Sequence, residues 1–354
     1  MKEAIIKSIF NEFDYKSNYV SHSELNSGHI NDTFLVKTDG AKNYILQRVN
    51  HKIFKDVPGL VNNKVLTSKH LKSKYPNLSE NELSEKVLSF VKTKNTDYYY
   101  LKKGGDFWNV MIFIDNSVTH EIVKDKEIAY EGGKLLGEFL NLTADFDSSQ
   151  LIDVIPNFHD MSFRYKQYAA ALQSASKKRL FKAEKYTTTV AELKEEMHIL
   201  QNLKEAGKIS VRVTHNDTKI SNALFDTNNK GICMIDTDTV MSGIIHYDFG
   251  DAIRTICNTA AEDEKDLSKV EFNLEYYKAY KKGFLEQTKN SLSETELTYL
   301  PLAVKTMIFI MALRFLTDYL NDDVYYKTNY PEHNLNRAKN QFKLIESFTK
   351  KIKY

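Results

Sequence analysis

The spacing of apolar residues changes near residue 115, and this change constrains the fold more than any other feature of the chain. Before it, short runs such as Thr33 to Lys37 and Tyr44 to Val49 are rich in β-branched and aromatic residues, which predicts strands. After it, segments such as Asp125 to Leu142 repeat apolar residues at helical spacing. The sequence therefore predicts an α+β, bilobal fold with lobes at residues 1–115 and 116–354.

The first lobe reads as an antiparallel sheet with a helix. The two strands named above are joined by a turn that contains Asp39 and Gly40, a dipeptide suited to positive backbone angles. A rough apolar stripe over Leu60 to Lys74 predicts a helix. Two further strands are expected at Tyr98 to Leu101 and at Phe107 to Ile114.

The second lobe reads as long helices with short strands between them. Gly207 is a fitting C-cap for one of these helices. The expected helices, besides the one from Asp125, are Thr187 to Ala206, Leu267 to Leu285, Glu294 to Leu320 and His333 to Ile352, and the expected strands are Ser210 to Thr214, Ala223 to Phe225 and Ile232 to Ile235.

Charge and cysteine content exclude several classes of protein. The 49 basic and 47 acidic residues give a net charge of +2, so neither a nucleic acid nor a membrane surface is an expected partner. Cys233 and Cys257 are expected to be buried free thiols. The charged first ten residues do not resemble a signal peptide, and the apolar run Pro301 to Leu313 is interrupted by Lys305. We expect a cytoplasmic monomer.

The polar stretch from Val213 to Asp238 carries the strongest chemical signal. His215, Asp217, Lys219 and Asn222 follow the order H-x-D-x-K-x-x-N, which is the shape of a kinase catalytic loop. An Asp carboxylate can orient a hydroxyl and take its proton, while amide and carboxylate oxygens suit Mg²⁺. The alternative is ordinary turn chemistry, which also favours Asn, Asp and Thr.

A second carboxylate is needed to hold the metal, and two aspartates compete for this role. Asp236 directly follows an apolar strand and a hairpin, as the role requires. Asp248 opens a literal D-F-G, but it lies well beyond the hairpin and follows a loop. We therefore favour Asp236 as the ligand, and we interpret Asp248 as a helix N-cap or a loop anchor.

These segments resemble a known group of enzymes. THNDTKISN, IDTDTVMSG and YDFGDAIR are similar to motifs of the aminoglycoside-phosphotransferase and choline-kinase superfamily. GHINDTF, YILQRVN and ALRFLTDYL resemble most closely the N-acetylhexosamine 1-kinases within it. The resemblance implies a protein-kinase-like fold, in which a sheet lobe and a helical lobe flank a hinge that holds adenine. It also implies ATP as co-substrate and Mg²⁺ as cofactor.

The resemblance implies a role for each residue of the motif. Asp217 would be the catalytic base, and Asn222 and Asp236 would hold Mg²⁺. Lys219 would lie near the transferred phosphate, where aminoglycoside kinases usually carry His. Ile114, at the expected hinge, would contact the adenine. His215 would be a structural member of the loop.

The residues of the first lobe that would bind the nucleotide phosphates match the kinase pattern less closely. Gly28 stands in the place of the loop that covers them. Gln47 or Arg48 stands where a protein kinase has its strand lysine, and we favour Arg48 because a cation is needed there; an exposed strand Arg is the alternative. Asn62 and Asn63 occupy the region of the usual partner Glu, so a standard Lys–Glu pair is in doubt.

Four residues are candidates for contacts with the acceptor by resemblance to the sugar kinases: His29, Asp238, Arg314 and Tyr325. Arg314 lies in the apolar stretch IFIMALRFL, and a buried Arg needs a ligand or a carboxylate partner. The leading hypothesis is phosphorylation of the anomeric hydroxyl of N-acetylglucosamine or N-acetylgalactosamine. The alternatives are a kinase for choline, homoserine or an aminoglycoside, and a catalytically silent nucleotide-binding module.

Overall fold

The first lobe of the computed structural model is built on a six-stranded antiparallel sheet. The structure describes residues 2–25 and 30–353. The strands follow one another as β1 (Tyr19–Leu25), β2 (Asp32–Thr38), β3 (Tyr44–Val49), β6 (Phe107–Ile112) and β4 (Phe90–Val91), and β5 (Tyr100–Leu101) also pairs with β6. The expected antiparallel sheet is confirmed.

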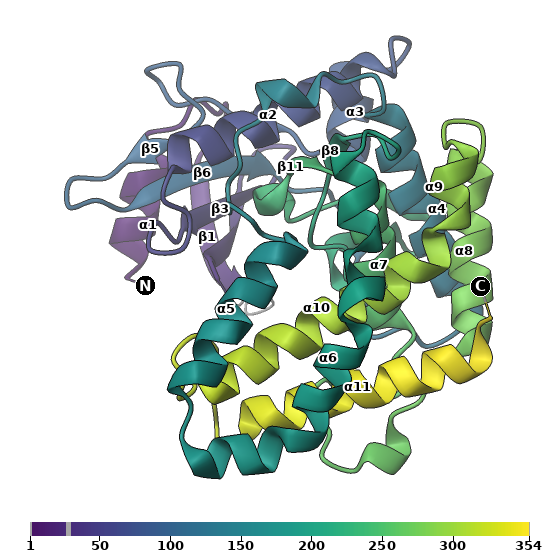
Figure 1. The fold of residues 1–354 in the computed structure, drawn as a ribbon. Helices are drawn as coiled ribbons and strands as arrows, with labels where there is room; N and C mark the ends of the chain where they lie inside the picture. Colours follow the sequence, from purple (N-terminus) through teal and green to yellow (C-terminus); the bar gives the residue numbers. More distant parts are fainter. Residues whose placement is uncertain (1, 26–29, 354) are drawn as a thin grey trace.

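Each face of the sheet is covered by its own apolar cluster. On one face, α1 (Glu3–Phe10) packs Ile6 and Phe10 against Phe34 and Leu46. On the other, α2 (Val57–Ser73) packs with Val49 of β3. Figure 1 shows this lobe in purple and blue, with α2 running along the sheet toward the second lobe. Helix α2 thus lies between the sheet and the second lobe.

The second lobe is helical, as expected, and Figure 1 shows its last helices in green and yellow. Five short strands sit among the helices: β7 (Ser117–Val118), β8 (Arg212–Thr214), β9 (Ala223–Asp226), β10 (Gly231–Met234) and β11 (Met241–Gly243). After the short α3 (Glu80–Lys86) of the first lobe come α4 (Lys126–Leu142), α5 (Met161–Ser174), α6 (Lys177–Glu205), α7 (Ile245–Ile256), α8 (Leu274–Thr288), α9 (Glu294–Thr298), α10 (Leu300–Leu320) and α11 (His333–Lys351).

Helix α10 forms the centre of the second lobe. It packs against α11, α7 and α5. By length and composition alone this 21-residue helix could cross a membrane, but 78% of its most apolar 18-residue segment is buried inside the protein. Lys305, which interrupts the apolar run, pairs with Glu196 of α6, the Lys Nζ lying 2.7 Å from the carboxylate. The helix is therefore explained as the core of the lobe.

Several helix boundaries differ from the sequence expectation, and a local signal explains three of these differences. Helix α6 begins ten residues before Thr187, at Lys177, and is capped by the side chain of Ser176. The expected helix from Leu267 begins at Leu274 instead, where Asn273 is the N-cap. The expected helix from Glu294 is two helices, because Pro301 lies in the first turn of α10 and can start but not continue a helix.

Candidate active site

The loop after β8 brings three of the motif residues together. The Asn222 side-chain amide donates hydrogen bonds to the carbonyl oxygen of Asp217 at 2.9 Å and to its Oδ2 atom at 2.8 Å. Lys219 Nζ lies 3.4 Å from the same Oδ2. The Asp217 side chain is about one-third exposed, with 33% of its surface accessible. Its carboxylate is thus oriented from two sides and still open to a ligand.

Buried anchors fix the shape of this loop. Asp248 is fully buried, and its carboxylate accepts the backbone N–H groups of His215 and Asn216, both at 2.7 Å. These bonds hold Asn216 in the left-handed region, at a φ of 65°. Asp248 lies inside α7, whose N-cap is Ile244, so the interpretation of Asp248 as a helix N-cap is wrong. It anchors the loop of residues 215–222, which we call the catalytic loop after its sequence motif, and burial raises the pKa of the Asp248 carboxyl to about 7.

His215 links the loop to the second aspartate. Its ring is fully buried, and Nε2 lies 2.9 Å from the carbonyl oxygen of Ile235, the residue before Asp236. Its Nδ1 accepts the backbone N–H of Asp217 at 3.4 Å, which assigns the proton to Nε2. Burial lowers the pKa of His215, so the ring is neutral. It connects the segments that carry Asp217 and Asp236.

Asp236 has the surroundings of a cation ligand. The residue is solvent-exposed at the end of the β9–β10 hairpin, in a left-handed conformation with φ at 56°. Within residues 2–25 and 30–353 its carboxylate makes no hydrogen bond or ion pair. Although solvent reaches it, protein encloses it on most sides; this enclosure, with Asp238 and Asp217, raises its pKa to about 7.

A divalent cation fits this arrangement. Asn222 uses its amide nitrogen on Asp217, which leaves its side-chain oxygen for a metal. That oxygen and the Asp236 carboxylate are the hard ligands that Mg²⁺ prefers, and the mutual repulsion of the neighbouring carboxylates would be relieved by a cation. Both residues that the sequence assigned to the metal therefore have chemistry that suits the role.

The first lobe contributes a group that the sequence did not single out. Lys64 of α2 is 2% exposed, and its ammonium donates to Gln47 Oε1 on β3 at 3.0 Å. The same ammonium forms an ion pair with Asp238, whose carboxylate is also bonded by Asn31. Asp238 is 4% exposed and is held by these partners; its expected contact with an acceptor stays a prediction.

The other nucleotide candidates lie apart from this group. Arg48 pairs with Asp32 and lies 3.8 Å from Asp106. Successive residues of a strand point to opposite faces, so Arg48 and the buried Gln47 cannot both face α2. Ile114 is buried, and its carbonyl oxygen accepts the hydroxyl of Ser117 where the chain passes into the second lobe. Gly28 and His29 lie outside the described residues.

Arg314 lies in an aromatic setting. Its guanidinium carbon is 5.5 Å from the ring centre of Phe158, 5.6 Å from Tyr326 and 5.9 Å from Tyr325. A second arginine, Arg164 of α5, donates to the Phe158 carbonyl oxygen at 2.6 Å. In the described part of the chain neither arginine pairs with a carboxylate, so the expected alternative of a salt bridge for Arg314 is not found. We call Phe158, Arg164, Arg314, Tyr325 and Tyr326 the arginine wall.

The arginine wall lies beside the catalytic loop. His159 follows Phe158 and is 8% exposed, and neither ring nitrogen has a partner among the described residues. Burial lowers the pKa of His159 to about 3, and Arg314 and Arg164 lower it further, while Asp251 opposes the shift. The His159 ring centre lies 5.2 Å from that of Tyr247, and the next residue, Asp248, anchors the backbone of His215 and Asn216 in the catalytic loop. Burial and Arg314 also lower the pKa of Arg164 to about 10.

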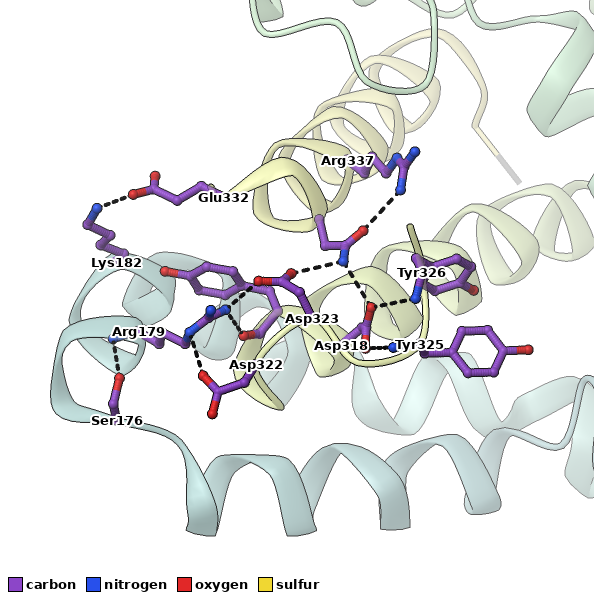
Figure 2. A network of polar contacts seen from close by, with 12 residues as sticks. Ser176, Arg179, Lys182, Asp318, Asp322, Asp323, Tyr325, Tyr326, Glu332 and Arg337 are labelled. Carbon is purple, nitrogen blue, oxygen red and sulfur yellow. Dashed lines mark hydrogen bonds and ion pairs between the residues drawn. The ribbon is translucent and has the colours of Figure 1, made fainter. Parts of the chain in front are cut away.

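A polar network positions the tyrosines of the wall (Figure 2). The buried carboxylate of Asp318 accepts the backbone N–H groups of Tyr325 at 2.8 Å and Tyr326 at 2.9 Å. Asn334 donates to the same carboxylate and to Asp323, which in turn pairs with Arg179. Asp318 thus clamps the segment that presents Tyr325 and Tyr326 to Arg314.

Sequence reasoning missed four residues of this region: Lys64, His159, Arg164 and Asp318. Asp318 had a usable signal, since it is a charge in the same apolar helical stretch as Arg314. Lys64 had none, because it lies among polar residues in VNNKVLTSKH. His159 and Arg164 lie in a polar segment with no such signal, and only the packing of α5 against α10 brings them near Arg314.

The comparisons with known proteins agree with this geometry. Residues 86–283, more than half of the chain, match the phosphotransferase enzyme family. The chain belongs to this family. The matched region includes Asp217, Lys219, Asn222 and Asp236.

Solved structures show the same protein-kinase-like fold at low sequence identity. An aminoglycoside phosphotransferase from Alicyclobacillus acidocaldarius is 13% identical, with a TM-score of 0.59 over 98% of this chain and 95% of that one. A choline kinase from Cryptosporidium parvum is 14% identical, with a TM-score of 0.60 over 98% and 96%. An amicoumacin kinase solved with AMP-PNP and Ca²⁺ is 12% identical, with a TM-score of 0.60 over 97% and 92%.

Proposed function

We propose that this phosphotransferase is an ATP-dependent kinase that phosphorylates the anomeric hydroxyl of N-acetylglucosamine or N-acetylgalactosamine, with Mg²⁺ as cofactor. The arginine wall is the observation that carries the choice of acceptor. Two cations without carboxylate partners, placed beside the catalytic loop, repel a cationic acceptor and favour an oxygen-rich one. Choline, ethanolamine and aminoglycosides are cations, whereas a sugar offers neutral hydroxyl and acetamido oxygens.

The residues of the catalytic loop suit the chemistry of the transfer. The acceptor hydroxyl gives its proton to Asp217 as its oxygen bonds to the γ-phosphorus, and ADP leaves with the electrons of the broken P–O bond. Asn222 keeps the Asp217 carboxylate in place through its amide. Lys219 lies where it can meet the transferred phosphoryl group.

Asn222 and Asp236 would hold the metal, and Mg²⁺ when bound neutralises charge on the phosphates. ATP as co-substrate is supported by the AMP-PNP in a structure of the same fold. In the acceptor site, guanidinium groups donate hydrogen bonds to hydroxyl and acetamido oxygens, and Tyr325 and Tyr326 offer aromatic faces to the apolar side of a sugar ring.

The anomeric position rests on the resemblance of the sequence to N-acetylhexosamine 1-kinases, above all in the stretch that contains Arg314. A panel assay tests the acceptor class. Mg²⁺-dependent ATP consumption is measured with N-acetylhexosamines, plain hexoses, choline, homoserine and an aminoglycoside. We expect the N-acetylhexosamines to give the highest kcat/KM; highest activity with choline or an aminoglycoside would overturn the proposal.

A further inference from the structure

Helix α2 places a buried lysine beside the metal-binding segment. Lys64 is one of the largest fully buried side chains of the described molecule, and its ammonium contacts Gln47 and Asp238. Asp238 lies two residues after Asp236. A charge held in a low-dielectric interior acts over several ångströms, so this ammonium influences whatever binds at Asp236.

The strand that normally carries the phosphate lysine of a kinase presents an amide at this point. Gln47 is 6% exposed and faces α2, and its Oε1 accepts both Lys64 Nζ and, at 3.2 Å, Asn109 Nδ2. In protein kinases a strand lysine pairs with a glutamate on the next helix. Here the strand carries the neutral partner and the helix carries the cation, so the usual arrangement is reversed.

Lys64 is not needed to dock α2 on the second lobe, because its neighbour does so. The Asn63 amide donates to the carbonyl oxygens of Ile152 and Val240, both at 2.9 Å, and accepts the N–H of Ile152 at 3.0 Å. A buried ion pair adds little net stability compared with apolar packing. The buried charge of Lys64 therefore calls for a role besides docking.

We propose that Lys64 is a positioning residue for the nucleotide phosphates, supplying from helix α2 the positive charge that this fold usually takes from β3. The inference rests on the proposed use of ATP. Lys64 acts through Gln47 and Asp238, both of which it contacts, and the charges of Lys64 and Asp238 both act on Asp236. Arg48 lies on the other face of the sheet, paired with Asp32, so it supplies no cation on the face of β3 that Lys64 contacts.

Two substitutions that break the same ion pair separate this role from a structural one. Lys64→Met removes the positive charge, whereas Asp238→Asn keeps it and removes the negative one. A structural role for the pair predicts that both weaken nucleotide binding alike. A role for the positive charge predicts that the two substitutions change the affinity for the nucleotide phosphates in opposite directions. Calorimetry with ADP and with adenosine, without metal or sugar, isolates the contribution of the phosphates.

We expect Lys64→Met to weaken ADP binding by about tenfold or more with adenosine binding unchanged. Asp238→Asn should bind ADP at least as tightly as the wild type. Gln47→Lys combined with Lys64→Met moves the cation to β3, within reach of Asp238, since Gln47 Nε2 already lies 3.4 Å from Asp238 Oδ2. This double variant should recover the preference for ADP, and it keeps the test decisive if Lys64→Met alone does not fold.

A control is the half-buried pair of Lys305 and Glu196 in the second lobe, where Lys305→Met with Glu196→Gln should leave the ADP-to-adenosine ratio unchanged. Equal weakening by Lys64→Met and Asp238→Asn, or no recovery in the double variant, would overturn the inference while leaving the proposed function intact. A wild-type protein that binds ADP no more tightly than adenosine would overturn both.

Discussion

Replacing Asp318 by Asn tests whether the clamped segment shapes the acceptor site. Asp318 accepts two backbone N–H groups, from Tyr325 and Tyr326, and each hydrogen bond to a charged acceptor contributes about 1.5–3 kcal/mol. An Asn retains one oxygen and turns an NH₂ group toward the second donor. At least one bond is then lost, which costs about 2–3 kcal/mol and shifts the ordered fraction of the segment roughly 30- to 150-fold.

The ordered segment has some stability of its own, and the first part of the lost free energy only uses up this stability. The remaining part disorders the segment and lowers its affinity for the acceptor. We therefore expect the sugar KM of Asp318→Asn to rise about tenfold or more, with the ATP KM unchanged. The assay combines steady-state kinetics with hydrogen exchange at the Tyr325 and Tyr326 amides. The matched control is Asp322→Asn, which removes the same charge from an exposed ion pair of the same segment and should change little.

Two results would contradict this prediction, one about the Asp318 clamp and one about the acceptor site. If the two amides stay protected in Asp318→Asn, the clamp does not hold the segment. If they lose protection while the sugar KM stays within about twofold of the wild type, the segment does not form part of the acceptor site.

Three further predictions concern the site itself. Asp217→Asn should lower turnover by about 10²–10⁴-fold with little change in ATP affinity, and near-normal turnover would show that Asp217 is not the base. Asp236→Ala should abolish Mg²⁺-dependent activity, whereas Asp248→Ala should mainly lower the melting temperature; a folded Asp248 variant that loses metal dependence beside an active Asp236 variant would reverse the assignment. Arg314→Ala should raise the sugar KM about tenfold or more and spare the ATP KM, and equal effects on both would place Arg314 outside the acceptor site.

Local sequence patterns were enough for most of the fold. Strand β3 has the expected bounds, Tyr44–Val49, because its apolar residues are bounded by turn residues. Helix α4 begins directly after Asp125, whose side chain caps it by accepting the Ile128 N–H at 2.8 Å. The catalytic loop was recognisable because its motif residues lie within eight positions of one another, from His215 to Asn222.

Contacts between distant segments could not be predicted in this way. Lys64 and Asp238 are 174 residues apart, and nothing local to either residue shows that they meet between the lobes. The sequence did not decide whether the partner of Arg314 is a ligand or a carboxylate. Its aromatic neighbours, Phe158 and the pair Tyr325 and Tyr326, lie on separate segments of the chain. Such sites depend on how helices pack, which short-range patterns do not specify.

Product analysis by phosphorus NMR shows directly whether the protein phosphorylates the anomeric hydroxyl of an N-acetylhexosamine. The protein is incubated with ATP and Mg²⁺ and with either the free N-acetylhexosamine or its 1-O-methyl glycoside. Capping the anomeric hydroxyl removes the group whose proton Asp217 is proposed to take. We expect a sugar 1-phosphate from the free sugar and no product from the glycoside. Equal turnover of the glycoside, or phosphate on another hydroxyl such as O6, would contradict this expectation.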